Sequence, residues 1–286
     1  MRNLLLNPVM NKEFKLRFRS FKSFLGLAFY LLALSILIVG FIYLQTQNSP
    51  MQLFRPDQSR EMFMLLAFIQ LGLILFITPG LTAGVISGER EKQTLNILLT
   101  TNQSSTSIIF GKLISSISFL LLMIIASLPI YSIVFLYGGI SPGQVLLILV
   151  FYIFTILVFG SIGIFFSTIV RRTIIAMVST YGVALFLIAG TAFLFTISMA
   201  VNNMGGTAPT NNPIPYFFAM LNPGFILFGF LQPNALNELS NQIGFGIQIP
   251  LWAAYLVSYS IIFLIMISVS IRKLRPNMKV KSESAG

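Results

Sequence analysis

The stretch from Met62 to Leu99 reads MFMLLAFIQLGLILFITPGLTAGVISGEREKQTLNILL, and it decides the fold. Its first part, residues 62–88, carries no charged side chain. About 20 apolar residues in a helix cross the hydrocarbon core of a bilayer, because each residue adds about 1.5 Å. Four charged residues then follow in succession, from Glu89 to Lys92. The stretch therefore predicts a membrane-spanning helix followed by a short charged segment at the membrane surface.

The composition extends this prediction to the whole chain. Of its 286 residues, 56% are hydrophobic and 9% are charged, and the mean hydropathy is +0.89. Soluble domains carry about 25% charged residues, so an ordinary soluble fold is excluded. Backbone polar groups in lipid must be paired within the spanning element, which leaves helices or a closed barrel. The uncharged runs are too long for barrel strands, so we predict an all-α polytopic membrane protein.

Six apolar runs of helical length are predicted to form one transmembrane domain, 1–286. The predicted transmembrane helices are 23–44, 62–86, 108–137, 144–170, 174–200 and 249–271. The other segments are predicted as an amphipathic interfacial helix at 1–22, a short charged helix at 88–100, an outer loop at 201–248 and a cytoplasmic tail at 272–286. Within the loop, the apolar stretch 214–221 is too short to cross the membrane, so a lid or half-helices are the alternatives to a plain loop.

The basic residues are distributed very unevenly between the two sides of the predicted spans. Of the 18 Lys and Arg residues, all except Arg55 and Arg60 fall on one side, together with both termini. Lys and Arg concentrate in the cytoplasmic loops of membrane proteins. We therefore expect a multi-pass protein in the plasma membrane of a bacterium, with cytoplasmic N- and C-termini and a basic face that contacts membrane lipid. This orientation accounts for the +11 net charge, and no nucleic-acid partner is expected.

The residues needed for several kinds of chemistry are missing from the sequence. The chain has no Cys and no His, which excludes Cys/His metal sites and Cys- or His-based catalysis. Gly111 and Lys112 do not belong to a phosphate-binding loop, because position 106 is Thr where that loop has Gly. No predicted span has an Asp, Glu, Lys, Arg or His near its centre, which argues against a proton relay. We expect no enzymatic activity, no catalytic residue, no metal and no cofactor in this chain.

Small residues and prolines mark the second and third predicted spans. Gly80, Gly84 and Gly88 recur every four residues, so they share one helix face and allow a second helix to approach closely. Pro79 precedes them, and Pro129 interrupts the third span. Proline removes a backbone hydrogen bond and bends a helix. The pattern indicates plain packing and kinking, and the alternative is that the two kinked spans transmit motion.

The charged segment itself is predicted to be helical. Ser87 can cap its start, and two glutamates, Glu89 and Glu91, lie in the first turn, where the helix dipole favours acids. An apolar ridge follows at helical spacing, formed by Leu95, Leu98 and Leu99. A helix that binds only lipid would carry Lys and Arg on its polar face rather than both signs. The two glutamates therefore favour a protein partner, and a solvated loop is the alternative.

With these features the segment resembles a known family. The pattern G-E-R-E-x-x-T-L-x-x-L-L after the second of six spans resembles the coupling helix of ABC-2-type ABC transporter permeases. In that family this helix docks into a groove on a cytoplasmic ATPase. The resemblance implies an ATPase-coupling interface formed by Glu89, Arg90, Glu91, Thr94, Leu95, Leu98 and Leu99. The family often has Gly just before the Thr and Pro after the Leu run, where this chain has Gln93 and Asn102.

Two further segments carry weaker resemblance. Residues 7–20 resemble the N-P-x-x-x-K-E-x-x-x-x-x-R-S opening of many such permeases, which forms an amphipathic connecting helix on the inner leaflet. The residues predicted to form this connecting helix include those that match the pattern and two phenylalanines of its apolar face: Asn7, Pro8, Lys12, Glu13, Phe14, Arg17, Phe18 and Arg19. The second segment, Leu221 to Phe225, reads L-N-P-G-F and lies in the predicted outer loop.

The resemblance implies the membrane subunit of an ATP-driven transporter, an exporter whose substrate pathway forms between two paired permeases. The implied partners are cytoplasmic ABC ATPase subunits, which would bind ATP and Mg, and a second permease of the same or a paralogous chain. The residues alone leave open an ATP-independent channel or secondary carrier, or a membrane anchor or scaffold. No group of polar residues selects a substrate.

Overall fold

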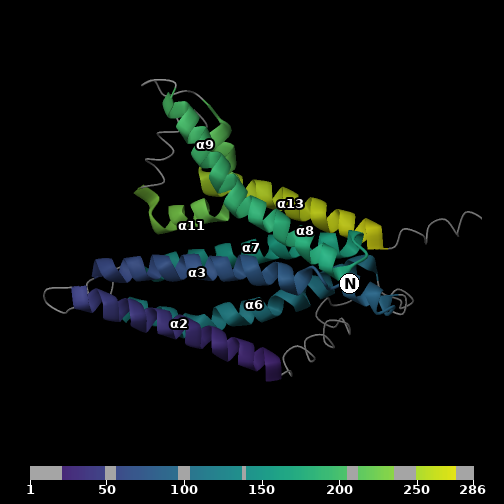
Figure 1. The fold of residues 1–286 in the computed structure, drawn as a ribbon, viewed down its shortest axis with the longest axis horizontal. Helices are drawn as coiled ribbons and strands as arrows, with labels where there is room; N and C mark the ends of the chain where they lie inside the picture. The colour runs from purple at the N-terminus through teal and green to yellow at the C-terminus, as the bar shows by residue number, and fades with distance from the viewer. Residues whose placement is uncertain are drawn as a thin grey trace, which may run out of the picture.

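The fold is known from a computed structural model, which describes residues 21–48, 56–95, 104–136, 140–204, 212–234 and 249–274. In these ranges every regular element is a helix, as predicted (Figure 1). Six helices are long and apolar enough to cross a membrane, which agrees with the six predicted spans.

The long helices follow the order of the predicted spans. They are α2 (Phe21–Asn48), α3 (Pro56–Thr82), α6 (Ser105–Leu136), α7 (Pro142–Ile169), a continuous run of three elements, and α13 (Leu251–Leu274). The continuous run consists of α8 (Thr173–Leu185), the π-helical turn η2 (Phe186–Gly190) and α9 (Thr191–Met204). The 24 residues of α13 extend about 36 Å, which exceeds the roughly 30 Å of a hydrocarbon core.

Local sequence sets the ends of α7, which the other helices surround. Ser141 accepts a hydrogen bond from the backbone N–H of Gln144 at 3.2 Å, and Pro142 occupies the first turn, where a missing N–H costs nothing. The helix ends at Ile169, just before the pair Arg171 and Arg172. The polar cap and the two arginines therefore lie at opposite ends of an otherwise apolar helix.

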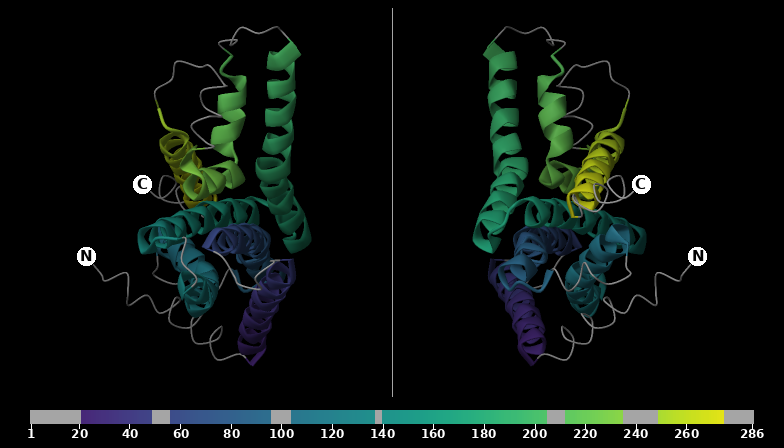
Figure 2. Two further views of the ribbon diagram at one scale, coloured as in Figure 1. Left: turned by 90° about the vertical axis from the view of Figure 1, so that its left-hand side faces the viewer. Right: turned by 90° about the vertical axis from the view of Figure 1, so that its right-hand side faces the viewer.

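Two short helices form a broken pair in the segment predicted as a loop at 201–248. They are α10 (Ile214–Leu221) and α11 (Pro223–Leu231), and the angle between them is 86°. Both are apolar, and each is too short to cross a membrane alone. α9 and α10 pack together and project away from the other helices (Figures 1 and 2).

The centre of the bundle is α7, which packs against α3, α6, α8, α11 and α13. α2 lies at the edge and packs mainly on α6 and α3 (Figure 1). Its outer face exposes large apolar side chains, including Phe24, Phe29 and Ile36. Such a surface is stable against lipid tails, so this face of α2 is suited to contact the bilayer.

The end of α3 follows from a proline. Pro79 lies inside α3, and the helix stops at Thr82. Turns at residues 83–86 then lead into the short helix α4 (Ser87–Glu91). The predicted span 62–86 thus begins and ends earlier as a regular helix. Pro79 lacks the N–H that would bond to the Leu75 carbonyl, so α3 loses a hydrogen bond close to its end.

Glycines allow α8 and α7 to approach the α3–α4 region closely. A Cβ at Gly80 would lie 2.9 Å from the Tyr181 hydroxyl of α8, and Gly84 and Gly88 both face Thr173 at the start of that helix. The contact at Gly163 of α7 is closer still, since a Cβ there would lie 2.0 Å from Thr82 Oγ1. Side chains at Gly80, Gly84 and Gly163 would force their neighbours to shift, whereas a Cβ at Gly88 would lie at an ordinary 3.7 Å from Thr173 Oγ1.

Candidate functional site at the charged end of the bundle

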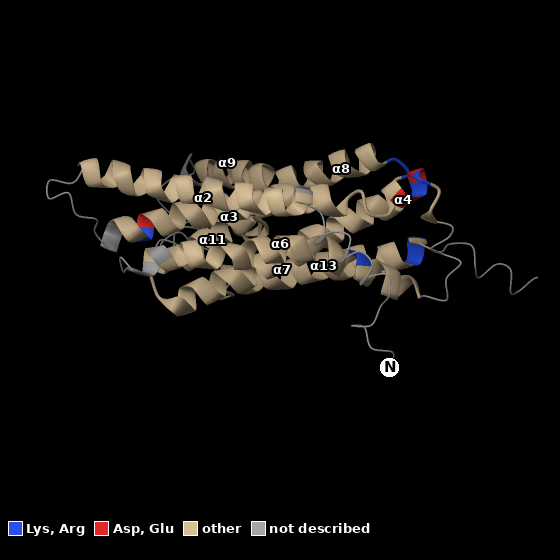
Figure 3. Cartoon of the chain, turned by 90° about the horizontal axis from the view of Figure 1, so that it is seen from below, with Lys and Arg blue, Asp and Glu red and all other residues tan. Residues whose placement is uncertain are grey.

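Charged side chains gather at one end of the described bundle (Figure 3). We call this the charged end; it comprises α4, the starts of α6 and α8, and the final turns of α7 and α13. At the opposite end the charged residues of the described chain lie in the first turns of α3. The charge asymmetry expected from the sequence is therefore present in the folded chain.

The start of α4 is attached to α7 through one buried serine. The backbone N–H groups of Ile86 and Ser87 both donate to Ser167 Oγ, at 2.8 and 3.0 Å. The first N–H groups of a helix have no partner within that helix, and here a neighbouring helix supplies it. Ser87 itself does not cap α4 as predicted: the cap position is Ile86, and the Ser87 hydroxyl donates to the Ala83 carbonyl at 3.2 Å.

Arg90 binds the end of α7. Its Nη2 donates to the Thr168 carbonyl at 3.0 Å and its Nη1 to the Val170 carbonyl at 3.1 Å. The last carbonyls of a helix lack intrahelical partners and carry partial negative charge, which a cation stabilises. A planar guanidinium can hold two such oxygens at once, so Arg90 fixes α4 against the final turn of α7.

Glu91 caps the start of α8. Its Oε1 accepts from the backbone N–H of Thr173 and its Oε2 from the Thr173 hydroxyl, both at 2.8 Å. The residue at the cap position of α8 is Arg172, whose side chain makes no capping hydrogen bond. The Glu91 carboxylate therefore takes the place of the Ser, Thr, Asp or Asn side chain that caps an ordinary helix start.

Glu89 pairs with a buried lysine on α6. Lys112 Nζ lies 2.6 Å from Glu89 Oε1, and the side chains are 2% and 29% exposed, respectively. A buried ammonium is costly without an anion beside it. Together the three charged residues Glu89, Arg90 and Glu91 tie α4 to α6, α7 and α8.

The helix predicted at 88–100 is interrupted at residues 92–94, and Leu95, the last described residue of the segment, is again helical. Regular α-helix ends at Glu91, and Gln93 has a φ of 58°, in the left-handed region that favours glycine. The family that this segment resembles often has Gly at this position, and Gly adopts a positive φ without steric cost. Residues 96–100, including Leu98 and Leu99, lie outside the described residues.

Of the predicted coupling residues that the structure describes, four are held within the chain or buried, and Thr94 lies in an exposed stretch. The side chains of Glu89, Arg90 and Glu91 make contacts within the chain, as described above, and Leu95 is buried at 7% exposure. The consecutive residues 92–94 are exposed and form the tip of the segment. Contact of these residues with an ATPase stays a prediction, and the tip is the part of the described segment most open to a partner.

The predicted connecting helix lies outside the described residues. This applies to all its predicted members: Asn7, Pro8, Lys12, Glu13, Phe14, Arg17, Phe18 and Arg19.

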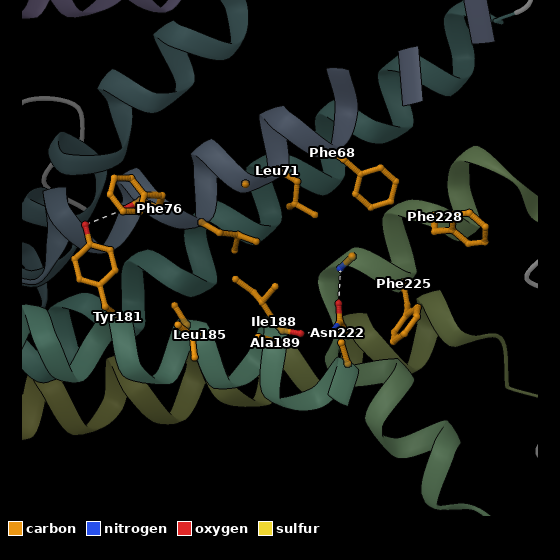
Figure 4. A pocket seen from close by; sticks show the side chains of 15 residues that line it. Phe68, Leu71, Phe76, Tyr181, Leu185, Ile188, Ala189, Asn222, Phe225 and Phe228 are labelled. Carbon is orange, nitrogen blue, oxygen red and sulfur yellow. Dashed lines mark hydrogen bonds between the residues drawn. The ribbon is translucent and has the colours of Figure 1, made fainter. Parts of the chain in front are cut away.

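A second feature is an apolar groove of about 830 Å³ between α3, η2 and α11. Figure 4 shows its wall, to which Phe68 and Phe76 of α3, Leu185 and Ile188 of the α8–η2 run, and Phe225 and Phe228 of α11 contribute. A π-helical turn is uncommon and often marks a functional position. The groove lies along the same two elements, α3 and α8, that α4 connects at the charged end.

Asn222 holds the edge of this groove together (Figure 4). Its Oδ1 accepts from the Gly224 N–H at 2.8 Å and caps α11. Its Nδ2 donates to the Ile188 carbonyl at 2.7 Å and to Thr191 Oγ1 at 2.9 Å. The carbonyl in the π-helical turn thus gains a partner, and the break between α10 and α11 is fixed to the centre of the α8–η2–α9 run.

The comparison with known families covers nearly the whole chain. A family model described as "ABC-2 family transporter protein" matches residues 8–273, from before α2 to the last turn of α13. The chain belongs to the ABC-2 transporter family. Membership agrees with the resemblance seen in the sequence and implies association with an ABC ATPase. A comparison with curated proteins gave no match.

Several residues of this ABC-2 protein that build the site were not predicted. Ser167 and Thr173 are ordinary polar residues near the ends of apolar runs, and nothing local marks them as partners of α4. Lys112 offered a signal, since it is the last charged residue before Arg171. Asn222 offered another, because it lies in the L-N-P-G-F segment. A lone polar residue in an apolar stretch is a candidate for a buried contact.

Proposed function

We propose that this chain is the membrane-spanning subunit of an ATP-driven ABC exporter, and that it pairs with a second permease and with cytoplasmic ATPase subunits. The charged end is the cytoplasmic end, in the plasma membrane of a bacterium. The observation that carries the proposal is the attachment of α4 to three other helices at that end. A segment tied in this way can pass a displacement to the whole bundle.

The exposed tip, residues 92–94, is the proposed contact for the ATPase. Pressure on the tip reaches α8 through Glu91, α7 through Arg90 and Ser167, and α6 through Glu89. Because the α8 run and α3 also line the apolar groove, a displacement of α4 changes the groove from both sides. ATP binding would in this way alter the path of the substrate without any nucleotide site in this chain.

The groove is the proposed substrate path on this subunit, and in a permease dimer the second subunit would close it. Asn222 and Tyr181 are its polar side chains, and both are hydrogen-bonded within this chain: the Tyr181 hydroxyl donates to the Phe76 carbonyl at 3.0 Å, and Asn222 makes the contacts described above. The apolar wall favours a substrate with an apolar part.

The absence of cysteine from the sequence permits a direct test of the coupling contact. Thr94→Cys places one thiol at the tip, and Asn234→Cys places one at an exposed position of the opposite end. Each variant is coexpressed with candidate ABC ATPases from the genome that encodes this chain. We expect a thiol-to-amine cross-linker to join Thr94→Cys to the ATPase, and a membrane-impermeant thiol reagent to label only Asn234→Cys in intact cells.

Three results would contradict parts of the proposal. Labelling of Thr94→Cys from outside intact cells would invert the topology. Transport into vesicles at an unchanged rate without nucleotide would favour the channel or carrier. Loss of cross-linking at Thr94→Cys together with intact copurification would move the ATPase contact away from the tip.

A further inference from the structure

A polar pocket of about 860 Å³ opens at the charged end, beside α4. It lies between the tip of the α4 segment, the end of α7 and the last turn of α13. Three of its lining residues are cations: Arg90, Arg171 and Lys273. Figure 3 shows the basic residues of α4 and α13 at this same end of the bundle. Its volume is within the range of pockets that hold small molecules.

No acidic side chain of the described chain lines this pocket. The two acids of α4 are engaged elsewhere, Glu89 with Lys112 and Glu91 with Thr173. Arg171 is near enough to Arg90 for their like charges to repel each other. A bound anion would relieve this repulsion, since it would be attracted to all three cations.

Arg90 is held in place before any ligand arrives. Two of its five N–H groups donate to the Thr168 and Val170 carbonyls, which fixes the orientation of the guanidinium. A fixed guanidinium loses little freedom when it binds an anion, and its planar fork matches a phosphate group. The pocket is therefore partly organised for a tetrahedral oxyanion.

The other lining residues indicate where the anion comes from. Leu95 and Ile169 give the pocket an apolar part, and Ile169 is the last residue of the membrane-spanning α7. Lys273 lies in the last turn of α13, where that span ends. The pocket thus combines cations with apolar side chains at the ends of two spanning helices. This combination suits a phospholipid headgroup better than a fully soluble ion.

We propose that this pocket binds the phosphodiester headgroup of an anionic phospholipid. The site requires that the helices span a membrane, and it does not depend on an ATPase. Its occupation would fill the space between α4, α7 and α13 and restrain the segment proposed to receive the ATPase. Lipid composition would therefore influence how firmly α4 is held.

Adjacent residues on α13 provide a matched test. Lys273 lines the pocket, whereas Arg272, one residue earlier, is not among its lining residues. The full chain is purified in detergent, and binding of phosphatidylglycerol and of phosphatidylcholine is measured by native mass spectrometry. We compare wild type, Lys273→Gln, Arg272→Gln and the double variant Arg171→Gln/Lys273→Gln. Arg90 is left intact because it holds α7.

Each basic residue near an anionic headgroup contributes about fivefold in affinity. We expect phosphatidylglycerol to bind more tightly than phosphatidylcholine, with losses of about fivefold in Lys273→Gln and about 25-fold in the double variant. Arg272→Gln should bind phosphatidylglycerol as wild type does. Lys273→Gln alone keeps the test valid if the double variant misfolds, because Lys273 is an exposed residue at a helix end.

Three outcomes would overturn the proposal. Equal losses in Lys273→Gln and Arg272→Gln would show that general charge attracts the lipid. Binding of inorganic phosphate that is lost in Lys273→Gln, together with equal binding of the two lipids by wild type, would assign the pocket to a soluble phosphate. Unchanged lipid binding in the double variant, together with lost ATPase copurification, would assign it to an acidic segment of a partner protein.

Discussion

The ion pair between Glu89 and Lys112 leads to a prediction about which partner can be removed. The two side chains differ in exposure, at 29% for Glu89 and 2% for Lys112. Removing one member of a buried pair costs about 3–5 kcal/mol, because the remaining charge stays buried. Glu89 Oε2 is buried without a hydrogen-bond partner in this conformation, but the side chain is partly exposed and can turn toward water once Lys112 is removed. Its loss of partner therefore costs about 1 kcal/mol. The two single substitutions should therefore differ strongly.

Glu89→Gln leaves the buried ammonium of Lys112 without its carboxylate. We expect the free energy of unfolding to fall by about 3 kcal/mol, at the lower end of the range because the Gln amide oxygen can still accept a hydrogen bond. Lys112→Met removes the ammonium and keeps an apolar side chain, so the expected loss is about 1 kcal/mol. The double variant Glu89→Gln/Lys112→Met should come within about 1 kcal/mol of wild type, because no buried charge remains.

The assay is thermal unfolding of the purified chain in detergent, followed by the fluorescence of the protein. At about 2 °C per kcal/mol, the midpoint should fall by about 6 °C in Glu89→Gln and about 2 °C in Lys112→Met. Lys92→Met is the control, since Lys92 is exposed and should change stability by less than about 0.5 kcal/mol. Equal losses in the two single variants, or no recovery in the double variant, would refute the argument from burial.

Three other predictions concern backbone and packing. Gly163→Ala should lower the unfolding midpoint, because the added Cβ would lie 2.0 Å from Thr82 Oγ1. Thr82→Ala in the same chain should restore part of the loss, and no restoration would contradict this contact. Because φ is 58° at Gln93, Gln93→Gly should stabilise the chain by up to about 1 kcal/mol and Gln93→Val should destabilise it. Equal thermal unfolding midpoints for the two variants would exclude the left-handed conformation. Asn222→Ala should cost about 2 kcal/mol and slow transport in vesicles. Asn222→Asp should keep the α11 cap and lose only the two amide contacts, so it should cost less; identical behaviour of both variants would assign all the effect to the amide contacts.

The fold was predictable because it depends on properties that sum over many residues. Any helix in lipid must be long, apolar and internally hydrogen-bonded, so the six spans follow from run lengths alone. The ends of the helices were less predictable, since they depend on single residues. Pro79 illustrates this, because α3 stops at Thr82 and gives way to turns where the uncharged run continues to Gly88.

The bonds that hold α4 could not be predicted, because they join it to other helices. The bonds to α7 and α8 link residues about 80 positions apart, and the Glu89–Lys112 pair links α4 to α6. Ser167 reaches Ile86, and Arg90 reaches the Thr168 carbonyl, only where α4 packs on α7. Sequence spacing predicts contacts within a helix, at three or four residues, and carries no information about this kind of pairing. The position of the site was accessible from charge and resemblance, and its internal geometry was not.

The contacts of α4 also change how its charges should be interpreted. Two glutamates near a basic membrane face favoured a protein partner, yet Glu89 and Glu91 each have a partner within the chain. Their presence is therefore explained by the need to hold α6 and α8, whether or not an ATPase binds. Alanine at Glu89 would release α6 and alanine at Arg90 would release α7, so either substitution would lower ATPase coupling through the fold alone. Substitutions at the exposed tip, such as Thr94→Cys, separate the two effects, because the Thr94 hydroxyl contributes a single exposed hydrogen bond, to the Glu89 carbonyl at 3.3 Å.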